Sequence, residues 1–346
     1  MRRATRQRID GPSRRGSSGV TLIELMVAMV LGLIVAGAAL AVFISNRQTY
    51  IATQSLDRLQ EGGRVAFELM SRDLRAAATI PCSSETTFAN EVVGGAWWSN
   101  WTSAKGGLRG YASAANAAFA TSSGLGGRVA DDDAGLFASG WTDAVEAMYA
   151  SPPAAAPIVV TAAASGATAP FTISVNKVDG IAQGDLLLAC DYGYSDAGVP
   201  VRGPAAVLFQ ADSASGTTIK ATNTAGFVIP LHNELQPNGL VSVLHANRWY
   251  IGHNSVGGTS LYRSSLVNTG GVAGTIDEEI VRGADGLALG YLAEGASSYV
   301  AADAVADWNA IVAIRMRLHL SGADKIDGAP IQRTVEHVIT IRNRAQ

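Results

Sequence analysis

A single carboxylate, Glu24, lies near the start of a long apolar segment. From Val20 to Ile44 the sequence runs for 25 residues with no other charged side chain. A charge in a hydrocarbon environment is costly, and where it is kept it usually has a function. The chemistry that such a carboxylate offers is ion pairing with a cation that is equally poorly solvated. The alternative is that Glu24 lies at the level of the lipid headgroups and reaches water there.

The chain has two cysteines, Cys82 and Cys190. Both follow the apolar segment and, by the topology argued below, lie on the exported side of a membrane. In an oxidising compartment, an even pair of cysteines favours a disulfide over a metal site. The bridge would close a loop of 108 residues and tie the end of a long helix to the β-rich part of the chain.

No catalytic or metal-binding constellation emerges from the sequence. The chain has no Gly-x-Ser-x-Gly elbow and no phosphate-binding loop. Asp131 to Asp133 lack the glycine and glutamate spacing of a calcium loop, which favours a solvated acidic turn. We therefore expect no enzymatic activity, no cofactor and no metal. The five histidines, which show no metal-ligand spacing, are His232, His245, His253, His319 and His337.

The apolar segment from residue 20 to residue 44 is long enough to span a bilayer once. Six arginines and one aspartate precede it, and positive charge before a first span holds that side in the cytoplasm. The rest of the chain is then exported. Without residues 1–19 the formal charge falls from −3 to −8, which argues against nucleic acid as an obligate partner.

Two other export signals are possible for the same part of the chain. Ala39-Leu40-Ala41 has the small residues of an ordinary signal-peptidase site, and cleavage there would leave a soluble chain that starts at Val42. The acid near the start of a long apolar run argues against this alternative. Arg14-Arg15 is a possible twin-arginine signal, but the Gly-Ser-Ser that follows is a poor match.

Helical periodicity continues beyond the membrane segment. Apolar residues from Leu56 to Leu74 recur at spacings of three and four, and charged residues occupy the other face. Glu68 and Arg72 have the spacing of an i,i+4 pair. The helix is expected to run from Val20 to Ala78, about 88 Å at 1.5 Å per residue, with Gly62-Gly63 as a bend or a close-packing point.

Residues 79–346 have the pattern of a β-rich head, so the fold class is α+β. Near the end of the chain, residues 310–320 and 335–341 alternate apolar and polar side chains and predict an antiparallel hairpin with a long loop from Ser321 to Pro330. The other expected strands are 158–161, 171–175, 185–190, 205–210, 217–221, 240–245, 248–252, 260–263 and 287–292.

The stretch from Gly94 to Pro170 is rich in alanine, glycine and serine and includes three prolines between residues 152 and 157. Such composition buries little surface per residue and predicts a loosely structured insertion or long loops. Trp97, Trp98 and Trp101 lie inside it. They form either an exposed contact surface or, as aromatic clusters more often do, part of the packing.

The start of the chain resembles the class III signal of type IV pilins and type II secretion pseudopilins. Gly19 precedes the apolar helix, and Glu24 stands where that family has its characteristic acid. The resemblance implies cleavage by a prepilin peptidase between Gly19 and Val20, followed by N-methylation of Val20. The family usually has phenylalanine where this chain has Val20. Glu24 then pairs with the α-amino group of a neighbouring subunit and fixes the register between subunits.

Later segments resemble one subfamily, the PilW-type minor pilins. The resemblance implies a long membrane-anchored helix packed on an antiparallel sheet, and no enzymatic activity. The segments that carry it are 59–67, 71–75, the cysteine after the helix, 184–190, 206–210, 249–252, 260–263, 307–315 and 341–344.

The resemblance also implies a biological setting. A minor pilin is a low-abundance structural subunit that helps initiate type IV pilus assembly and lies at the pilus tip, in systems that support adhesion and twitching motility. Its expected partners are other minor pilins, the major pilin, the prepilin peptidase, the inner-membrane assembly platform and a tip adhesin. The expected location is the inner membrane, single-pass with a periplasmic head, and then the extracellular pilus. The main alternative is a minor pseudopilin of the GspJ kind.

Overall fold

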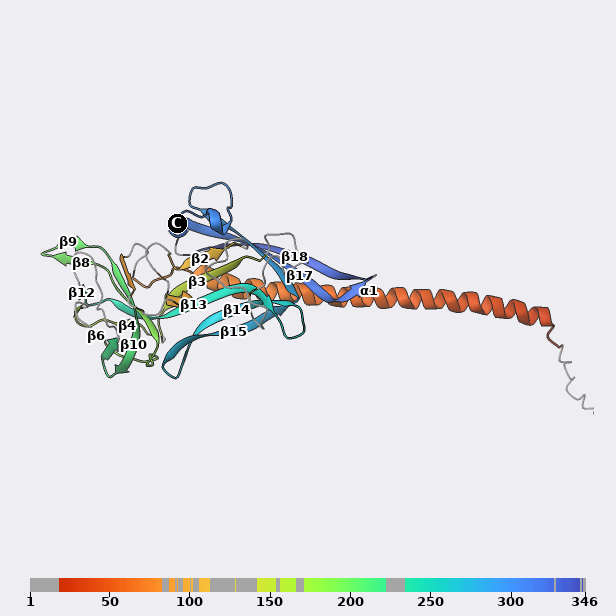
Figure 1. Cartoon of the computed structure of the whole chain (residues 1–346), viewed down its shortest axis with the longest axis horizontal. Helices are drawn as coiled ribbons and strands as arrows, with labels where there is room; N and C mark the ends of the chain where they lie inside the picture. Colours follow the sequence, from red (N-terminus) through yellow and green to blue (C-terminus); the bar gives the residue numbers. More distant parts are fainter. Residues whose placement is uncertain are drawn as a thin grey trace, which may run out of the picture. The chain divides into compact units, whose positions relative to one another are not determined.

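The computed structural model describes most of the chain beyond residue 18 (Figure 1). The chain divides into two compact units, residues 1–53 and residues 54–346, and each is described by itself. The described residues are 19–82, 87–90, 92, 96–99, 101, 106–112, 128, 142–153, 156–165, 171–221, 234–326, 328–342 and 344.

One long helix, α1 (Leu22–Ala76), begins in the first unit and ends in the second. Its apolar residues in the first unit are exposed, and by length and composition the helix is able to cross a membrane. The helix ends where Ala78 takes a left-handed backbone conformation, φ 63°, and donates its N–H to the carbonyl of Met148 at 2.8 Å. The boundaries lie two residues inside the expected ones at each end.

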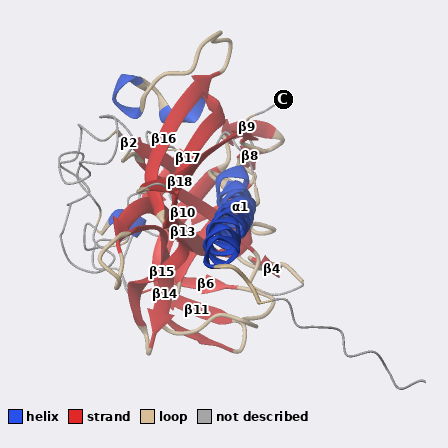
Figure 2. Ribbon diagram, turned by 90° about the vertical axis from the view of Figure 1, so that its right-hand side faces the viewer, coloured by secondary structure: helices blue, strands red, loops and turns tan. Residues whose placement is uncertain are grey.

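The part of α1 in the second unit buries one face against strands (Figure 2). Leu59, Met70 and Leu74 are buried there, as the periodicity predicts. Gly63 permits close packing, because a Cβ at this position would lie 2.9 Å from the Cγ2 atom of Val335. The exposed residues on the other face include Arg58, Arg64, Glu68, Arg72 and Arg75.

The largest sheet has 11 strands, and its main path runs β15-β14-β13-β7-β10-β11-β6, with antiparallel neighbours throughout. Four more strands join it from the side: β1 pairs with β10 in parallel, β2 pairs with β3, and β3 and β4 pair with β13. The bounds are β1 (Thr87–Asn90), β2 (Leu108–Tyr111), β3 (Ala144–Ser151), β4 (Ile158–Val159), β6 (Phe171–Ser174), β7 (Leu186–Asp191), β10 (Ala205–Ser215), β11 (Thr218–Ala221), β13 (Leu240–His253), β14 (Thr259–Thr269) and β15 (Val272–Arg282).

A second, antiparallel sheet has the order β16-β17-β18. Two small sheets pair β5 with β12 and β8 with β9. The described 3-10 turns are η1 (Trp97–Ser99), η3 (Ala302–Ala304) and η4 (Trp308–Ala310). The strand bounds are β5 (Ala164–Ser165), β8 (Tyr194–Asp196), β9 (Val199–Arg202), β12 (Glu234–Leu235), β16 (Ala284–Ala293), β17 (Ile311–Ile326) and β18 (Ala329–Thr340).

Two expected details of the strands are wrong. The hairpin of β17 and β18 is present, but its long loop is not: both strands continue until Ile326 pairs with Ala329, and Gly328 (φ 85°) lies in the tight turn. The two strands expected at 240–245 and 248–252 are one strand, β13. The residues between them continue its pairing, with Ala246 opposite Met148 and Asn247 opposite Ala147.

The stretch 94–170 is not loose throughout. Within it, β2 pairs with β3, and β3 pairs with β13 inside the main sheet. Ala144, Ala147 and Ala150 of β3 are almost completely buried. Composition was misleading here, because small side chains contribute to a core where backbones come close together, as the hydrogen bond from Ala150 N to Thr79 O at 2.9 Å shows.

The core that holds α1 joins elements from both ends of the second unit. Buried residues of α1 pack with β2 and β3, with the middle of β13, and with the sheet β16-β17-β18. A second cluster fills the space around β6, β7, β10 and β11. The helix is therefore part of the core of the head and is not a separate stalk within this unit.

Candidate processing and assembly site

The start of α1 is capped by Thr21 and Glu24. The Thr21 hydroxyl accepts the N–H of Glu24 at 3.3 Å, and a carboxylate oxygen of Glu24 accepts the N–H of Thr21 at 3.3 Å and its hydroxyl at 3.2 Å. This reciprocal pattern is a capping box, which satisfies backbone donors that a helix start leaves free. The sequence signal for this cap is Thr-x-x-Glu before an apolar run. Ion pairing is the role that we predict for Glu24 from the sequence, and the cap is not among those predictions.

Gly19 and Val20 lie just before this cap. Neither belongs to a regular element, both are exposed, and a Cβ on Gly19 would meet no atom within 4 Å. The peptide bond between them is thus sterically accessible. An amino group created at Val20 would stand one residue before the cap, near the carboxylate of Glu24 and the positive end of the helix dipole, where an anion is favoured and a cation is not. The positive charge of that amino group would add to the positive end of the helix dipole, so the carboxylate of Glu24 would be needed to offset both.

Cys82 and Cys190 form a disulfide. Their Cα atoms are 6.0 Å apart, and the bridge spans 108 residues. Cys190 is completely buried in β7, next to Ala206 and Leu208 of β10 in one apolar cluster. The bridge therefore fastens the segment that follows α1 to an interior strand of the main sheet.

Asp73 is a buried carboxylate on the inner face of α1. Its Oδ2 atom accepts the indole N–H of Trp249, from β13, at 3.1 Å, and the guanidinium of Arg263, from β14, lies 3.9 Å away. Both Asp73 and Trp249 are 0 % exposed. Burial raises the pKa of Asp73, and the nearby Arg263 partly opposes that rise. Asp73 has no role of its own in the sequence predictions, which miss this contact.

Two buried ion pairs hold other parts of the head. The guanidinium of Arg202, from β9, donates two hydrogen bonds to the carboxylate of Asp191, at 2.6 and 3.0 Å. Asp191 directly follows the disulfide cysteine of β7. Glu146 of β3 accepts the guanidinium of Arg248 of β13 and, at 2.8 Å, the hydroxyl of Tyr111. Buried pairs of this kind cost desolvation, and their contact requires one geometry. Glu146 and Arg248 are directly opposite each other in the pairing of β3 with β13.

Several of the tryptophan, histidine and acidic residues noted in the sequence pack or pair with other residues of the head. Trp101 is 3 % exposed and stacks on Phe88 at 5.4 Å, which supports packing over an exposed contact surface. His337 stacks on Phe67 of α1 at 3.8 Å, and His319 contacts Asp285. Glu68 pairs with Arg64 at 3.0 Å and not with Arg72. Asp131 to Asp133 and His232 lie outside the described residues; within the described part, no cluster of His, Cys, Asp and Glu suits a metal ion.

Residues 14–40 match a family model described as the prokaryotic N-terminal methylation motif. No curated protein and no solved structure matches the chain. The matched segment contains Gly19, Val20 and Glu24, together with the first turns of α1. It is the class III prepilin signal, which implies processing by a prepilin peptidase and assembly with pilus machinery. The chain combines this signal with a long apolar helix and an antiparallel β-rich head, which is a pilin-like α+β fold. The signal supports a pilin or pseudopilin role.

Proposed function

We propose that the chain is a PilW-type minor pilin, a structural subunit that helps initiate type IV pilus assembly at the pilus tip and performs no catalysis. The observation that carries the proposal is the capped segment Gly19 to Glu24 at the start of one uninterrupted helix whose other end is built into the head.

The size of the head supports a position at the tip. Residues 54–346 form one unit of 293 residues, with an 11-stranded sheet and a three-stranded sheet. A subunit repeated along a shaft must fit its head between copies above and below, whereas a subunit at the end of a filament has no copy above it. A large head is therefore accommodated more easily at the tip.

In this proposal the peptidase cuts between Gly19 and Val20, and Val20 is then N-methylated. The chain is held in the inner membrane with a cytoplasmic leader and a periplasmic head until it enters the pilus. Its partners are other minor pilins, the major pilin, the assembly platform and a tip adhesin. Mass spectrometry of the amino-terminal peptide from membranes tests the first step. A chain that begins at Val42 would contradict it, and Gly19→Arg should leave the precursor uncut.

A minor pseudopilin of a type II secretion system is the second candidate, because the matched segment is common to both classes. Deleting the gene from its host separates the two. Loss of surface pili with normal protein secretion supports the minor pilin, and loss of secretion with normal pili supports the pseudopilin. The unaltered gene, returned as a single copy, should restore whichever property was lost.

A further inference from the structure

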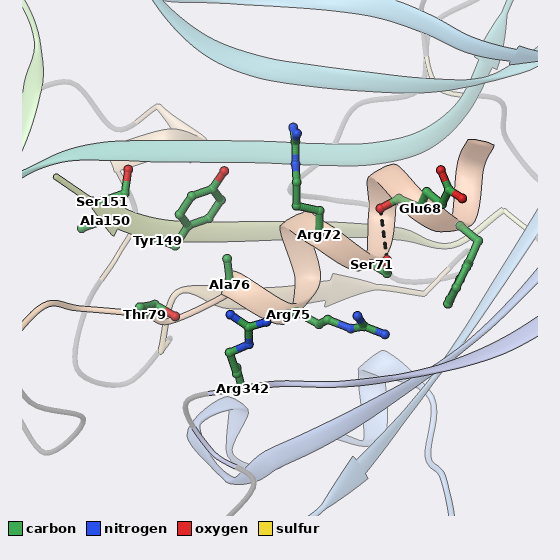
Figure 3. A pocket seen from close by; sticks show the side chains of 11 residues that line it. Glu68, Ser71, Arg72, Arg75, Ala76, Thr79, Tyr149, Ala150, Ser151 and Arg342 are labelled. Carbon is green, nitrogen blue, oxygen red and sulfur yellow. Dashed lines mark hydrogen bonds between the residues drawn. The ribbon is translucent and has the colours of Figure 1, made fainter. Parts of the chain in front are cut away.

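A cleft of about 590 Å³ lies beside the last turns of α1 in the second unit (Figure 3). Three sides are distinct: Arg72 and Arg75 come from α1, Ser151 and Tyr149 come from the end of β3, and Arg342 follows β18. This volume falls within the range of roughly 300–1,000 Å³ that is usual for sites that bind small ligands or single side chains. None of these residues takes part in the processing segment or the disulfide.

The cleft carries uncompensated positive charge. The backbone N–H of Arg342 donates to the carbonyl of Arg75 at 3.1 Å, which joins the backbones of these two residues, and both side chains line the cleft. Among the described residues, neither has a carboxylate within salt-bridge distance, whereas Glu68, the acid of the cleft, is paired with Arg64. Arg72 lies 3.9 Å from Asp73, which is buried behind it. Arg75 and Arg342 thus line the cleft as exposed cations that have no ion-pair partner among the described residues.

The opposite wall offers neutral hydrogen-bonding groups. Ser151 lies 2.8 Å from the Nε2 atom of His245, and the Tyr149 ring stacks on the same imidazole at 4.9 Å. Burial, and secondarily Arg72, lowers the pKa of His245, so the imidazole stays neutral. Burial raises the pKa of Tyr149, so its hydroxyl stays protonated. This wall adds hydrogen-bonding groups without adding negative charge.

We propose that this cleft binds the carboxylates of an acidic segment of a partner protein. Guanidinium groups are planar forks that bind carboxylates in a bidentate manner, and two of them lining one cleft offer a separate fork to each of two acidic side chains of one segment. This proposal does not depend on whether the chain belongs to a pilus or to a secretion pseudopilus.

The charge of the head favours a short acidic segment over a polyanion. Residues 54–346 contain 19 of the 26 basic and 27 of the 29 acidic side chains, a formal charge of −8. A nucleic acid extends well beyond the cleft and is repelled by this net charge. One or two carboxylates inside the cleft interact mainly with the arginines within a Debye length, about 8–10 Å at physiological salt.

The test uses the full chain in detergent and, as the probe, a fluorescent tetraglutamate peptide with blocked ends. At low salt the unaltered chain should bind it, and Arg75→Gln with Arg342→Gln should weaken binding by roughly tenfold, because two exposed charge contacts are lost. The matched control is Arg333→Gln with Lys220→Gln, which removes the same charge from exposed positions of β18 and β11. Its dissociation constant should change less than about twofold.

Charge reversal separates a lost site from a damaged fold. Arg75→Glu with Arg342→Glu should lose the tetraglutamate peptide and gain affinity for a tetralysine peptide, which an unfolded chain would not do. The proposal is overturned if the unaltered chain does not bind tetraglutamate, or if the control pair weakens binding as much as the cleft pair. It is also overturned if a 12-nucleotide single-stranded DNA binds more tightly than the peptide through the same two arginines.

Discussion

The indole N–H of Trp249 donates to the carboxylate of Asp73 at 3.1 Å, although 176 positions separate the two residues in the sequence. Trp249 lies in β13, which pairs with β14 on one side and with β3 on the other. Asp73 lies one turn before the end of α1. This hydrogen bond thus attaches the helix to an interior strand of the sheet through a buried polar contact, where an unpaired partner would be costly.

Asp73 should give the stability of the head a specific pH dependence. Burial raises its pKa in the folded chain above the ordinary value of 3.8, so the folded state holds the proton more tightly than the unfolded state. Its contribution to the free energy of unfolding is therefore largest below pH 3.8 and falls as the pH rises through the folded-state pKa. In Asp73→Asn this component should vanish, as urea unfolding at pH 4 and pH 7 would show.

Asp73→Ala separates charge from hydrogen bonding. The asparagine variant keeps an acceptor for Trp249, whereas alanine leaves the indole N–H unpaired, so the alanine variant should be less stable than the asparagine variant by about 1–3 kcal/mol. Asp212→Asn, at an exposed position of β10, serves as the control for the loss of one negative charge. Equal stability of the alanine and asparagine variants would show that the hydrogen bond contributes nothing.

The disulfide should contribute strongly to the stability of the head. Because it closes a loop of 108 residues, its loss increases the entropy of the unfolded chain, and the chain-entropy model gives roughly 4–5 kcal/mol. Cys82→Ser should lower the urea midpoint by a corresponding amount, and so should reduction of the unaltered chain. Adding reductant to Cys82→Ser should then cause no further loss. Free thiols in chain recovered from the periplasm would contradict the bridge.

The capping box makes it possible to test two roles of Glu24 separately. Glutamine at this position still accepts the Thr21 N–H but carries no charge, whereas alanine removes both. If an ion pair with the amino group of a neighbouring subunit drives assembly, Glu24→Gln and Glu24→Ala should both reduce surface piliation severely while leaving cleavage after Gly19 intact. Normal piliation with glutamine and loss with alanine, at matched protein levels, would assign Glu24 a capping role alone.

Gly63 should be intolerant of even one extra carbon. An added Cβ would lie 2.9 Å from Val335 Cγ2, so Gly63→Ala should destabilise the head by about 1–3 kcal/mol despite its better helix propensity. Val335→Ala should make room for the new methyl group, so the double variant should be more stable than the sum of the single effects predicts. The control is Gly274→Ala, where a Cβ would meet no atom within 4 Å. Strictly additive effects would show that the contact is relieved elsewhere.

The parts of the fold that sequence predicts well are those in which a regular period coincides with burial. The sequence predicts the helix because apolar residues from Leu59 to Leu74 recur with the period of an α-helix. It predicts the pairing of β17 with β18 because Ile314 to Leu320 alternate with the period of a strand. The sequence does not predict β3 as a strand, because its alanines are also typical of loops. Only the close approach of neighbouring backbones shows that they belong to the core. β15 was missed for the opposite reason: its run of acidic side chains at an exposed edge carries no apolar pattern.

The functional residues divide in the same way. Gly19, Val20 and Glu24 lie within one short segment, so their spacing alone predicts a processing segment, and the cysteine count predicts the bridge. The pairing of Asp73 with Trp249 and the joining of Arg75 to Arg342 depend on which elements become neighbours. Neither residue type nor local spacing carries that information, because a solvated and a buried aspartate look identical in a helical stripe.

The packing of α1 against β17 and β18 sets an order of events during export. The first element of the head has its buried face completed by residues of β17 and β18 and by Ile341, which are made long after the helix itself. Until these residues have crossed the membrane, the apolar face of the helix is covered only in part, by β2, β3 and β13, and apolar surface exposed in this way makes a chain prone to aggregation. A variant truncated before β17 should therefore be degraded faster than the unaltered chain, as pulse-chase measurement of its lifetime would show.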